Sequence, residues 1–269
     1  MDEPPAPLPV PAPIDADARA EAPKPELRPQ AVGASRGARW WTEAWRMFAA
    51  APAIWLVIAV IYIALMLGLA LVPVIGPLAS TLLTPILAGG ALQGARAVDR
   101  GEPLAVGHLF ACFQQHTAPL AILALLSFAG WLAIWITCLG AMIAVAGFGV
   151  LGLLLSGDPL QLGSAALTTI GTAALVVVLV MALLAVPLMM ALWFAPALII
   201  FADEKPWAAM KASFAGCLEN IAPSAVYGLI GVLFALLATL PFGLGWLVLG
   251  PMVATSAYAS YVDVFGRPQ

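Results

Sequence analysis

Residues 84–103 read TPILAGGALQGARAVDRGEP, and residues 250–268 read GPMVATSAYASYVDVFGRP. In each stretch an alanine stands six residues after the first proline and a valine thirteen residues after it, and a second proline follows a charged segment. An apolar segment with an internal proline, followed by charge, is typical of a transmembrane span and its exit. The recurrence predicts that one unit of the chain is repeated.

The composition predicts a membrane protein. Hydrophobic residues make up 63% of the 269 residues and charged residues only 9%. No Asp, Glu, Lys, Arg or His occurs in residues 53–92, 117–157, 159–202 or 220–262. A helix needs about 20 apolar residues to cross the ~30 Å hydrocarbon layer, so each of these stretches can hold at least one span. A water-soluble protein of this size could not cover so much apolar surface.

Residues 1–35 differ from the rest of the chain. They are rich in proline and alanine with scattered charge, a composition that cannot form a core and predicts a disordered cytoplasmic tail. No cleavable signal peptide is expected, because the first apolar stretch begins after residue 50 and is long enough to span. The transmembrane helical domain is predicted over residues 36–269.

Three copies of one unit account for this domain, at 36–103, 104–206 and 207–269. Each unit comprises an amphipathic interfacial helix, a span opened by a proline, a turn, and a second span that contains a proline. The opening prolines are Pro52, Pro119 and Pro223, and the prolines within the second spans are Pro85, which is expected to break its span, Pro187 and Pro251. The fold class that follows is an all-α, polytopic transmembrane helix bundle with six spans.

The second unit is longer than the others, and the extra length lies at residues 140–175. This segment could extend two helices, form a re-entrant segment, or add a hairpin. The hairpin would make eight spans instead of six.

The positive charges predict the orientation. In the six-span arrangement the turns at 72–77, 156–163 and 241–245 lie on one side of the membrane and contain no Lys or Arg. Eight Lys and Arg residues of the membrane domain lie on the opposite side. The positive-inside rule then places both termini and the three interfacial helices on the cytoplasmic side of the inner membrane. The eight cations are Arg36, Arg39, Arg46, Arg96, Arg100, Lys205, Lys211 and Arg267.

The segments MALWFAPALIIFADEKPWAAMKASFAGCLEN (190–220), VYGL and YASYVDVF resemble a family of uncharacterised multi-span inner-membrane proteins of proteobacteria that share a domain of unknown function. They are more distantly similar to the membrane domain of some glycerophosphodiester phosphodiesterases. The resemblance covers roughly residues 36–266 and implies a fold and a location. It implies no catalytic or binding residue.

One cluster could bind a metal ion. His108, Cys112 and His116 are spaced by four residues on the predicted interfacial helix 104–119, and imidazole and thiolate are zinc ligands. Three such residues drift around a straight helix, and no fourth Cys or His stands nearby. Interfacial residues without a metal are the favoured interpretation, so no metal and no cofactor is expected.

Aromatic and basic side chains on the interfacial helices fit membrane anchors beside lipid head groups. The predicted anchors are Arg39, Trp41, Trp45, Arg46, Trp207 and Lys211.

The predicted spans contain almost no ionisable residue, although proton relays and intramembrane catalysis need such groups. The sequence therefore favours a non-enzymatic inner-membrane protein that acts through the lipid bilayer, or through a protein partner bound by its tail or amphipathic helices. A transporter or flippase of an apolar or lipid-like molecule is the alternative. An enzyme using the cytoplasmic rim, with Asp203 and Glu204 beside the histidines, ranks third. Nothing in the sequence indicates nucleic-acid binding.

Overall fold

The computed structural model describes residues 28–156 and 162–268, which form helices and no strand. The first half of the chain contains α2 (Arg36–Ala50), α3 (Pro52–Ala70), α4 (Ile75–Asp99), a 3-10 helix η1 (Val106–Phe110), α5 (Cys112–Gln115) and α6 (Thr117–Ser156). The second half contains α7 (Leu162–Trp193), α8 (Ala195–Ala202), α9 (Pro206–Glu219), α10 (Ile221–Thr239) and α11 (Trp246–Phe265). The all-α fold class is confirmed.

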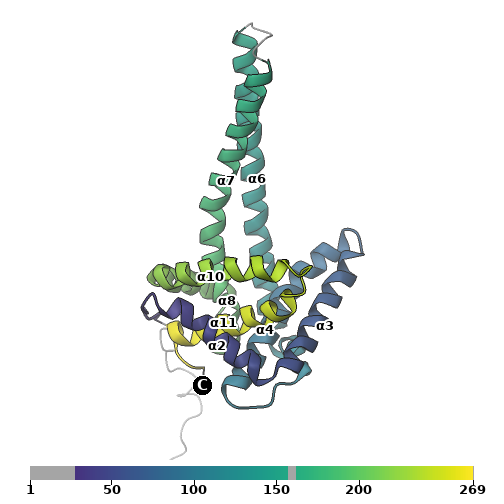
Figure 1. Cartoon of the computed structure of the whole chain (residues 1–269), viewed down its shortest axis with the longest axis vertical. Coiled ribbons are helices and arrows are strands. Elements are labelled where there is room, and N and C mark those ends of the chain that lie inside the picture. The colour runs from purple at the N-terminus through teal and green to yellow at the C-terminus, as the bar shows by residue number, and fades with distance from the viewer. Residues whose placement is uncertain (1–27, 157–161, 269) are drawn as a thin grey trace, which may run out of the picture.

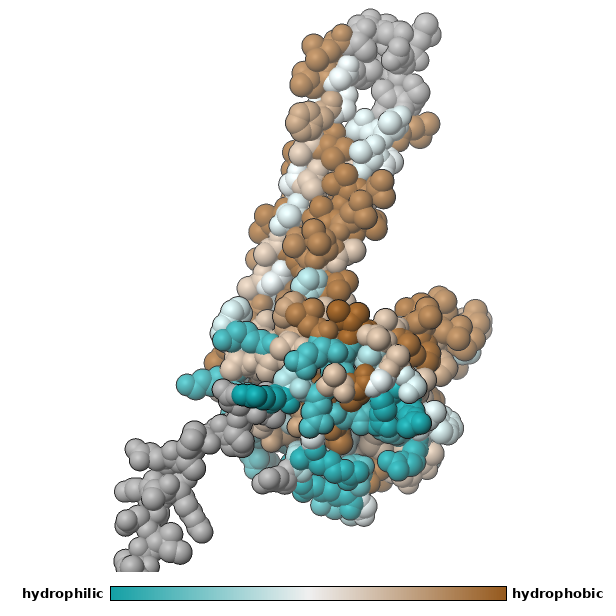
Figure 2. Space-filling view, turned by 90° about the vertical axis from the view of Figure 1, so that its left-hand side faces the viewer, coloured by the Kyte–Doolittle hydropathy of each residue, from teal (hydrophilic) through white to brown (hydrophobic). Residues whose placement is uncertain are grey.

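Two parts can be distinguished in Figure 1. Helices α6 and α7 rise as one long hairpin, and the remaining helices form a base from which the hairpin projects. The base, as the term is used below, comprises residues 28–115 and 194–268. Hydrophilic residues gather on the base, whereas the hairpin and the α3–α4 turn are largely apolar (Figure 2).

Five helical segments in the described residues are long and apolar enough to cross a membrane, which supports an integral membrane protein. They are Pro52–Ala70, Ile75–Asp99, Thr117–Gly152, Ala166–Ala202 and Ile221–Thr239. The sixth predicted span corresponds to α11, which is absent from this group. Half of its residues are buried, and it packs against α2, α3, α4 and α10, so it is the central helix of the base.

The apolar helix α10 contacts mainly α2 and α11. In Figure 1 both α10 and α2 run across the direction of the α6–α7 hairpin. The predicted six-span bundle is therefore supported only as a helical membrane protein, and its span count stays a prediction.

The hairpin explains the extra length of the second unit. Helix α6 continues without a break to Ser156 and α7 begins at Leu162, so the described part of residues 140–175 extends two helices, the first of the three alternatives. At 1.5 Å per residue α6 is about 60 Å long, twice the hydrocarbon thickness. Ile134 and Cys138 of α6 and Ala185 of α7 form a small buried cluster within the hairpin, separate from the main core.

The helix boundaries can be compared with the predictions about the prolines and the repeats. Pro85, Pro187 and Pro251 lie inside the continuous helices α4, α7 and α11, so the prediction that these segments contain a proline is confirmed and the predicted break at Pro85 is wrong. The three predicted interfacial helices correspond to α2, to the pair η1 and α5, and to α9, which differ in length and regularity. The threefold repeat therefore stays a prediction.

Residues 28–35 precede the first helix and pack against the base. The amide of Gln30 donates to the carbonyl of Val264 at 2.8 Å, and the side chain of Asn220, 1% exposed, binds both Val32 N–H (2.8 Å) and Gln30 C=O (3.0 Å). Residues 1–27 of the predicted tail lie outside the described residues. The start and the end of the described chain thus meet at one place on the base.

Candidate functional site: an apolar cavity in the base

A cavity of about 430 Å³ lies between α3, α4 and α11, with contributions from η1, α7 and α8. None of the 18 residues that line it is charged. Cavities of this size and apolar lining are typical of small-molecule sites, which occupy roughly 300–1,000 Å³. It is half-open, because the lining residues Ala88, Trp246 and Gly250 are exposed.

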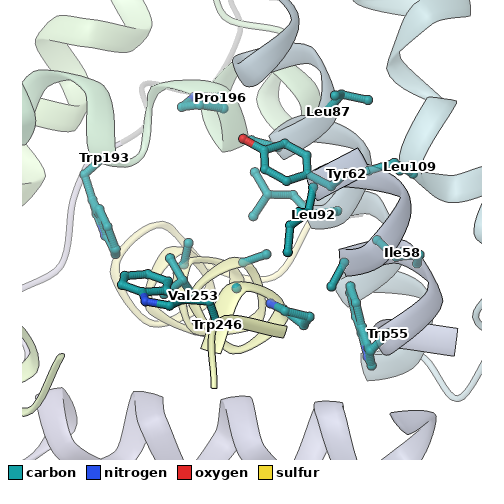
Figure 3. Close-up of a pocket in the computed structure, with 18 residues that line it drawn as sticks. Trp55, Ile58, Tyr62, Leu87, Leu92, Leu109, Trp193, Pro196, Trp246 and Val253 are labelled. Carbon is teal, nitrogen blue, oxygen red and sulfur yellow. The ribbon is translucent and has the colours of Figure 1, made fainter. Parts of the chain in front are cut away.

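The cavity exists because small residues face one another inside an aromatic frame. Ala59 of α3, Ala91 of α4 and Ala254 of α11 leave the space between the three helices unfilled. The frame consists of Trp55, Tyr62, Trp193 and Trp246, which Figure 3 shows on three sides of the cavity. Helices that carried Leu or Phe in place of these alanines would pack directly against each other.

Two of the four aromatic residues are fixed by the protein itself. Trp55 is fully buried, and its indole N–H donates to the carbonyl of Met47 at 3.2 Å. The indole N–H of Trp246 donates to Thr239 Oγ1 at 3.3 Å. These bonds orient both rings as walls of the cavity.

The other side of the cavity depends on a break between α7 and α8. At this break the hydroxyl of Ser213 accepts the N–H of Phe194 at 2.9 Å and donates to the carbonyl of Met190 at 2.7 Å. In a regular helix these two backbone groups would bond each other, so the hydroxyl is inserted into the helix ladder. Pro196, which has no N–H to continue the ladder, stands just after the break. The break brings Trp193 and Pro196 to the cavity wall.

A polar hollow of about 230 Å³ lies on the other face of α4. It is lined by Gln93, Arg96, Ala97, Arg100, Glu102 and His108. The α4 residues that line the apolar cavity are 87, 88, 91 and 92, and at 100° per residue these two sets point in opposite directions. The hollow and the cavity are therefore separate features.

Ion pairs connect the polar ends of the base helices. Asp99, whose side chain is 10% exposed, lies 3.2 Å from Arg267 and 3.9 Å from Arg46, and accepts a hydrogen bond from Tyr258 at 3.2 Å. Asp263 binds Arg36 and also accepts the indole N–H of Trp40 at 2.7 Å. These acids fix the helix ends, and neither lines the cavity.

The metal candidates are not brought together. The predicted helix 104–119 is divided into η1, α5 and the start of α6, which removes the regular spacing of the three residues. His108 bonds its ring Nδ1 to the backbone of Ala105, and Cys112 is buried beside the Gln93 side chain, 3.8 Å away. The described residues contain no group of three ligands suited to a metal ion.

The predicted anchors divide into two groups. Trp45 and Trp207 are exposed by 54% and 61%, and Arg39, Arg46 and Lys211 are also exposed, so all five are accessible to lipid head groups. Trp41 is not, because it is only 4% exposed and stacks on Tyr227 at 4.7 Å, with its N–H donated to the Tyr227 carbonyl. The interpretation of Trp41 as an anchor is therefore wrong.

Sequence reasoning missed the cavity. Tyr62 stands alone among the apolar residues of the first predicted span, and Ala88 and Ala91 belong to a small-residue stretch that also fits close helix packing. An isolated tyrosine in an apolar helix was the one available signal.

Comparison with known proteins supports a membrane location. A probable inner membrane protein of Burkholderia thailandensis is 29% identical over 235 residues, which cover 86% of this chain and 83% of that protein. No protein-family model matches the chain, and no solved structure matches it. The likeness to the membrane domain of glycerophosphodiester phosphodiesterases is not shown by these comparisons.

Proposed function

We propose that this chain is a non-catalytic integral inner-membrane protein that holds a hydrocarbon chain of a membrane lipid in the cavity of its base. The observation that carries the proposal is the apolar cavity itself, with about 430 Å³ of space and no charged lining residue. Burying apolar chain surface against such a wall is favourable, and no charged lining group has to lose its hydration.

The surroundings of the cavity support a ligand that comes from the bilayer. The apolar residues Val60 and Leu67 of α3 and Leu78 of α4 are exposed by 51%, 63% and 52%. Exposed apolar surface on membrane-capable helices is expected to face lipid tails. A lipid chain could then enter sideways, without passing through water.

A filled cavity tests the proposal. Ala91→Phe places a ring in the open space, whereas Ala64→Phe adds the same ring to an exposed position of α3 outside the lining. The proteins are purified in mild detergent, and the retained lipid per protein is measured by mass spectrometry of the extract. The wild type and Ala64→Phe are expected to retain one lipid more than Ala91→Phe. Equal retention in all three would contradict the proposal.

Transport of a lipid-like molecule is the second candidate. A path between the three prolines within the spans would favour it, but of these only Pro251 lines the cavity. A cavity that involves one of the three prolines supports holding a chain more than passing it across the membrane. Acceleration of lipid exchange between leaflets of liposomes by the purified protein would favour transport instead.

We propose in addition that both termini are cytoplasmic. The hydrogen bond from Gln30 to Val264 and the pairing of Arg36 with Asp263 join the two ends of the described chain. Contact between the two ends supports placing them on one side of the membrane, which fits an even number of crossings such as the predicted six. Six crossings place the turn around Phe242 outside, where Phe242→Cys would react with an impermeant maleimide in intact cells. An unreactive Phe242→Cys would mean that α10 does not cross.

A protein partner remains part of the proposal at the level of the cytoplasmic surface. The exposed side chains of Arg39, Arg46 and Lys211 offer positive charge to anionic head groups or to an acidic partner. Deleting residues 1–27 and comparing the co-purifying proteins with those of the full chain tests whether the tail contributes.

A further inference from the structure

Two hydrogen-bond donors on the cavity wall have no partner in the protein. Within residues 28–156 and 162–268, neither the hydroxyl of Tyr62 nor the indole N–H of Trp193 makes a hydrogen bond, although both residues line the cavity. The other two aromatic residues of the wall, Trp55 and Trp246, donate to protein oxygens. Trp55 and Trp246 therefore serve as walls, whereas Tyr62 and Trp193 can donate hydrogen bonds to a bound molecule.

The Tyr62 hydroxyl is directed across the cavity. In Figure 3 its oxygen points away from Trp55 and Ile58, which share its helix, and towards the side lined by Pro196 and Trp193. The lining on that side is apolar apart from the indole N–H. Hydrogen-bond donors inside an apolar site in a membrane have little access to water. A bound molecule with an oxygen acceptor would satisfy them.

We infer that the cavity recognises the acyl ester of a glycerolipid, with the ester carbonyl accepting hydrogen bonds from Tyr62 and Trp193. This inference rests on the proposed function, since it assumes that a lipid chain occupies the cavity. An ester matches the site because it is neutral and accepts hydrogen bonds without needing to donate one. The hydrocarbon beyond the carbonyl fills the remaining space between α3, α4 and α11.

Other lipid classes fit the lining less well. A fatty acid would bring an ionised carboxylate into a cavity where no Lys, Arg or His is available to compensate it. A pure hydrocarbon would leave both donors without an acceptor. An alkyl ether keeps the chain but replaces the ester carbonyl by a methylene, and so provides the sharpest comparison.

The test uses a matched pair of lipids that differ only in the linkage. A diacyl phosphatidylcholine and its dialkyl ether analogue, with the same chains and head group, compete at equal concentration for the delipidated full-length protein, and native mass spectrometry counts each complex. One hydrogen bond to a neutral acceptor corresponds to roughly a fivefold preference, so the wild type, with two such bonds, is expected to favour the ester by at least that factor.

Tyr62→Phe is expected to lose several-fold of the ester preference and to keep only the part that the Trp193 hydrogen bond contributes. It should keep its thermal stability, because the removed hydroxyl makes no hydrogen bond in the protein. Tyr227→Phe is the matched control: its hydroxyl pairs with Ser256 at 2.8 Å and lies outside the cavity lining, so the ester preference should persist.

The outcomes separate this inference from the proposed function. Equal binding of ester and ether by the wild type, or an unchanged preference in Tyr62→Phe, would overturn the ester assignment while chain binding stands. Failure of both lipids to bind, together with equal lipid retention by Ala91→Phe and the wild type, would overturn both.

Discussion

Asp263, close to the end of α11, binds the guanidinium of Arg36, at the start of α2, through both of its carboxylate oxygens. The two residues are separated by 227 positions in the sequence. The hydrogen bond to Asp263 raises the pKa of Arg36, although burial acts in the opposite direction. The pair therefore joins the first and the last described helix of the base.

Asp263→Asn is expected to destabilise the protein by about 1–3 kcal/mol, because Arg36 loses its counter-charge and the indole N–H of Trp40 loses a charged acceptor. Glu43→Gln is the matched control, since Glu43 makes a single, more exposed contact with Arg36 at 3.2 Å and should change stability by about 0.5 kcal/mol or less. Thermal unfolding of the detergent-solubilised variants measures the difference. Equal effects of the two substitutions would show that Asp263 does not hold the helices together.

The burial of Glu43 predicts that the stability of the protein depends on pH. Burial raises the pKa of Glu43 above its ordinary value of 4.5, and Arg36 opposes this only in part. Between the ordinary and the raised pKa the folded protein binds more protons than the unfolded chain, so the contribution of Glu43 to stability falls as the pH rises through that window. The unfolding midpoint of the wild type relative to Glu43→Gln should therefore decline with increasing pH above 4.5. A relative midpoint that increases with pH would contradict this sign.

Ser213 should be essential for the break between α7 and α8. Ser213→Ala removes the hydroxyl that satisfies Phe194 N–H and Met190 C=O, and is expected to cost about 1–3 kcal/mol. Ser80→Ala is the control, because the Ser80 hydroxyl bonds only the Pro77 carbonyl at the exposed start of α4, and a change within about 0.5 kcal/mol is expected. Thermal unfolding compares the two. If Ser213→Ala were as mild as Ser80→Ala, the helix would close the break without the hydroxyl.

The three cysteines should resist modification in the folded protein. Cys112, Cys138 and Cys217 are all buried and free. Burial raises the pKa of the Cys112 thiol, and raises that of Cys217 to about 12, which leaves little reactive thiolate at pH 8. Maleimide treatment followed by intact mass measurement should show no adduct on the native wild type and three after denaturation.

Thr42→Cys, at an exposed position of α2, serves as the positive control and should gain one adduct in the native state. Rapid labelling of Cys217 in the native wild type would mean that α9 is not packed against α7 as the structure describes.

The sequence predicted the class of the fold because its signals are local. The uncharged stretches predicted apolar helices, and Pro52 opens α3 as expected, since a proline costs no hydrogen bond in a first turn. The amphipathic pattern of 36–50 predicted α2 correctly. The helix predicted over 104–119 was wrong, because the His108 side chain bonds the backbone of Ala105 and favours a 3-10 turn over a continuous helix.

Features that depend on distant contacts could not be predicted. Trp41 is an aromatic residue on an amphipathic helix, as an interfacial anchor would be. Only the position of α10 shows that its ring stacks on Tyr227 instead. The α7–α8 break arises from Ser213, which follows Phe194 by 19 residues and lies on another helix. The cavity results from alanines on three helices that are separate in the sequence, so no single segment could reveal it.

The central claim is that a lipid chain occupies the cavity of the base, and photo-crosslinking tests it most directly. A phosphatidylcholine carrying a diazirine in its acyl chain is incorporated into nanodiscs with the protein, and the crosslinked residues are located by peptide mass spectrometry. The account predicts adducts at cavity residues such as Ile58, Ala91 and Val253, and their loss in Ala91→Phe but not in Ala64→Phe. Adducts confined to outward-facing residues, such as Leu229 and Leu236 of α10, would contradict it.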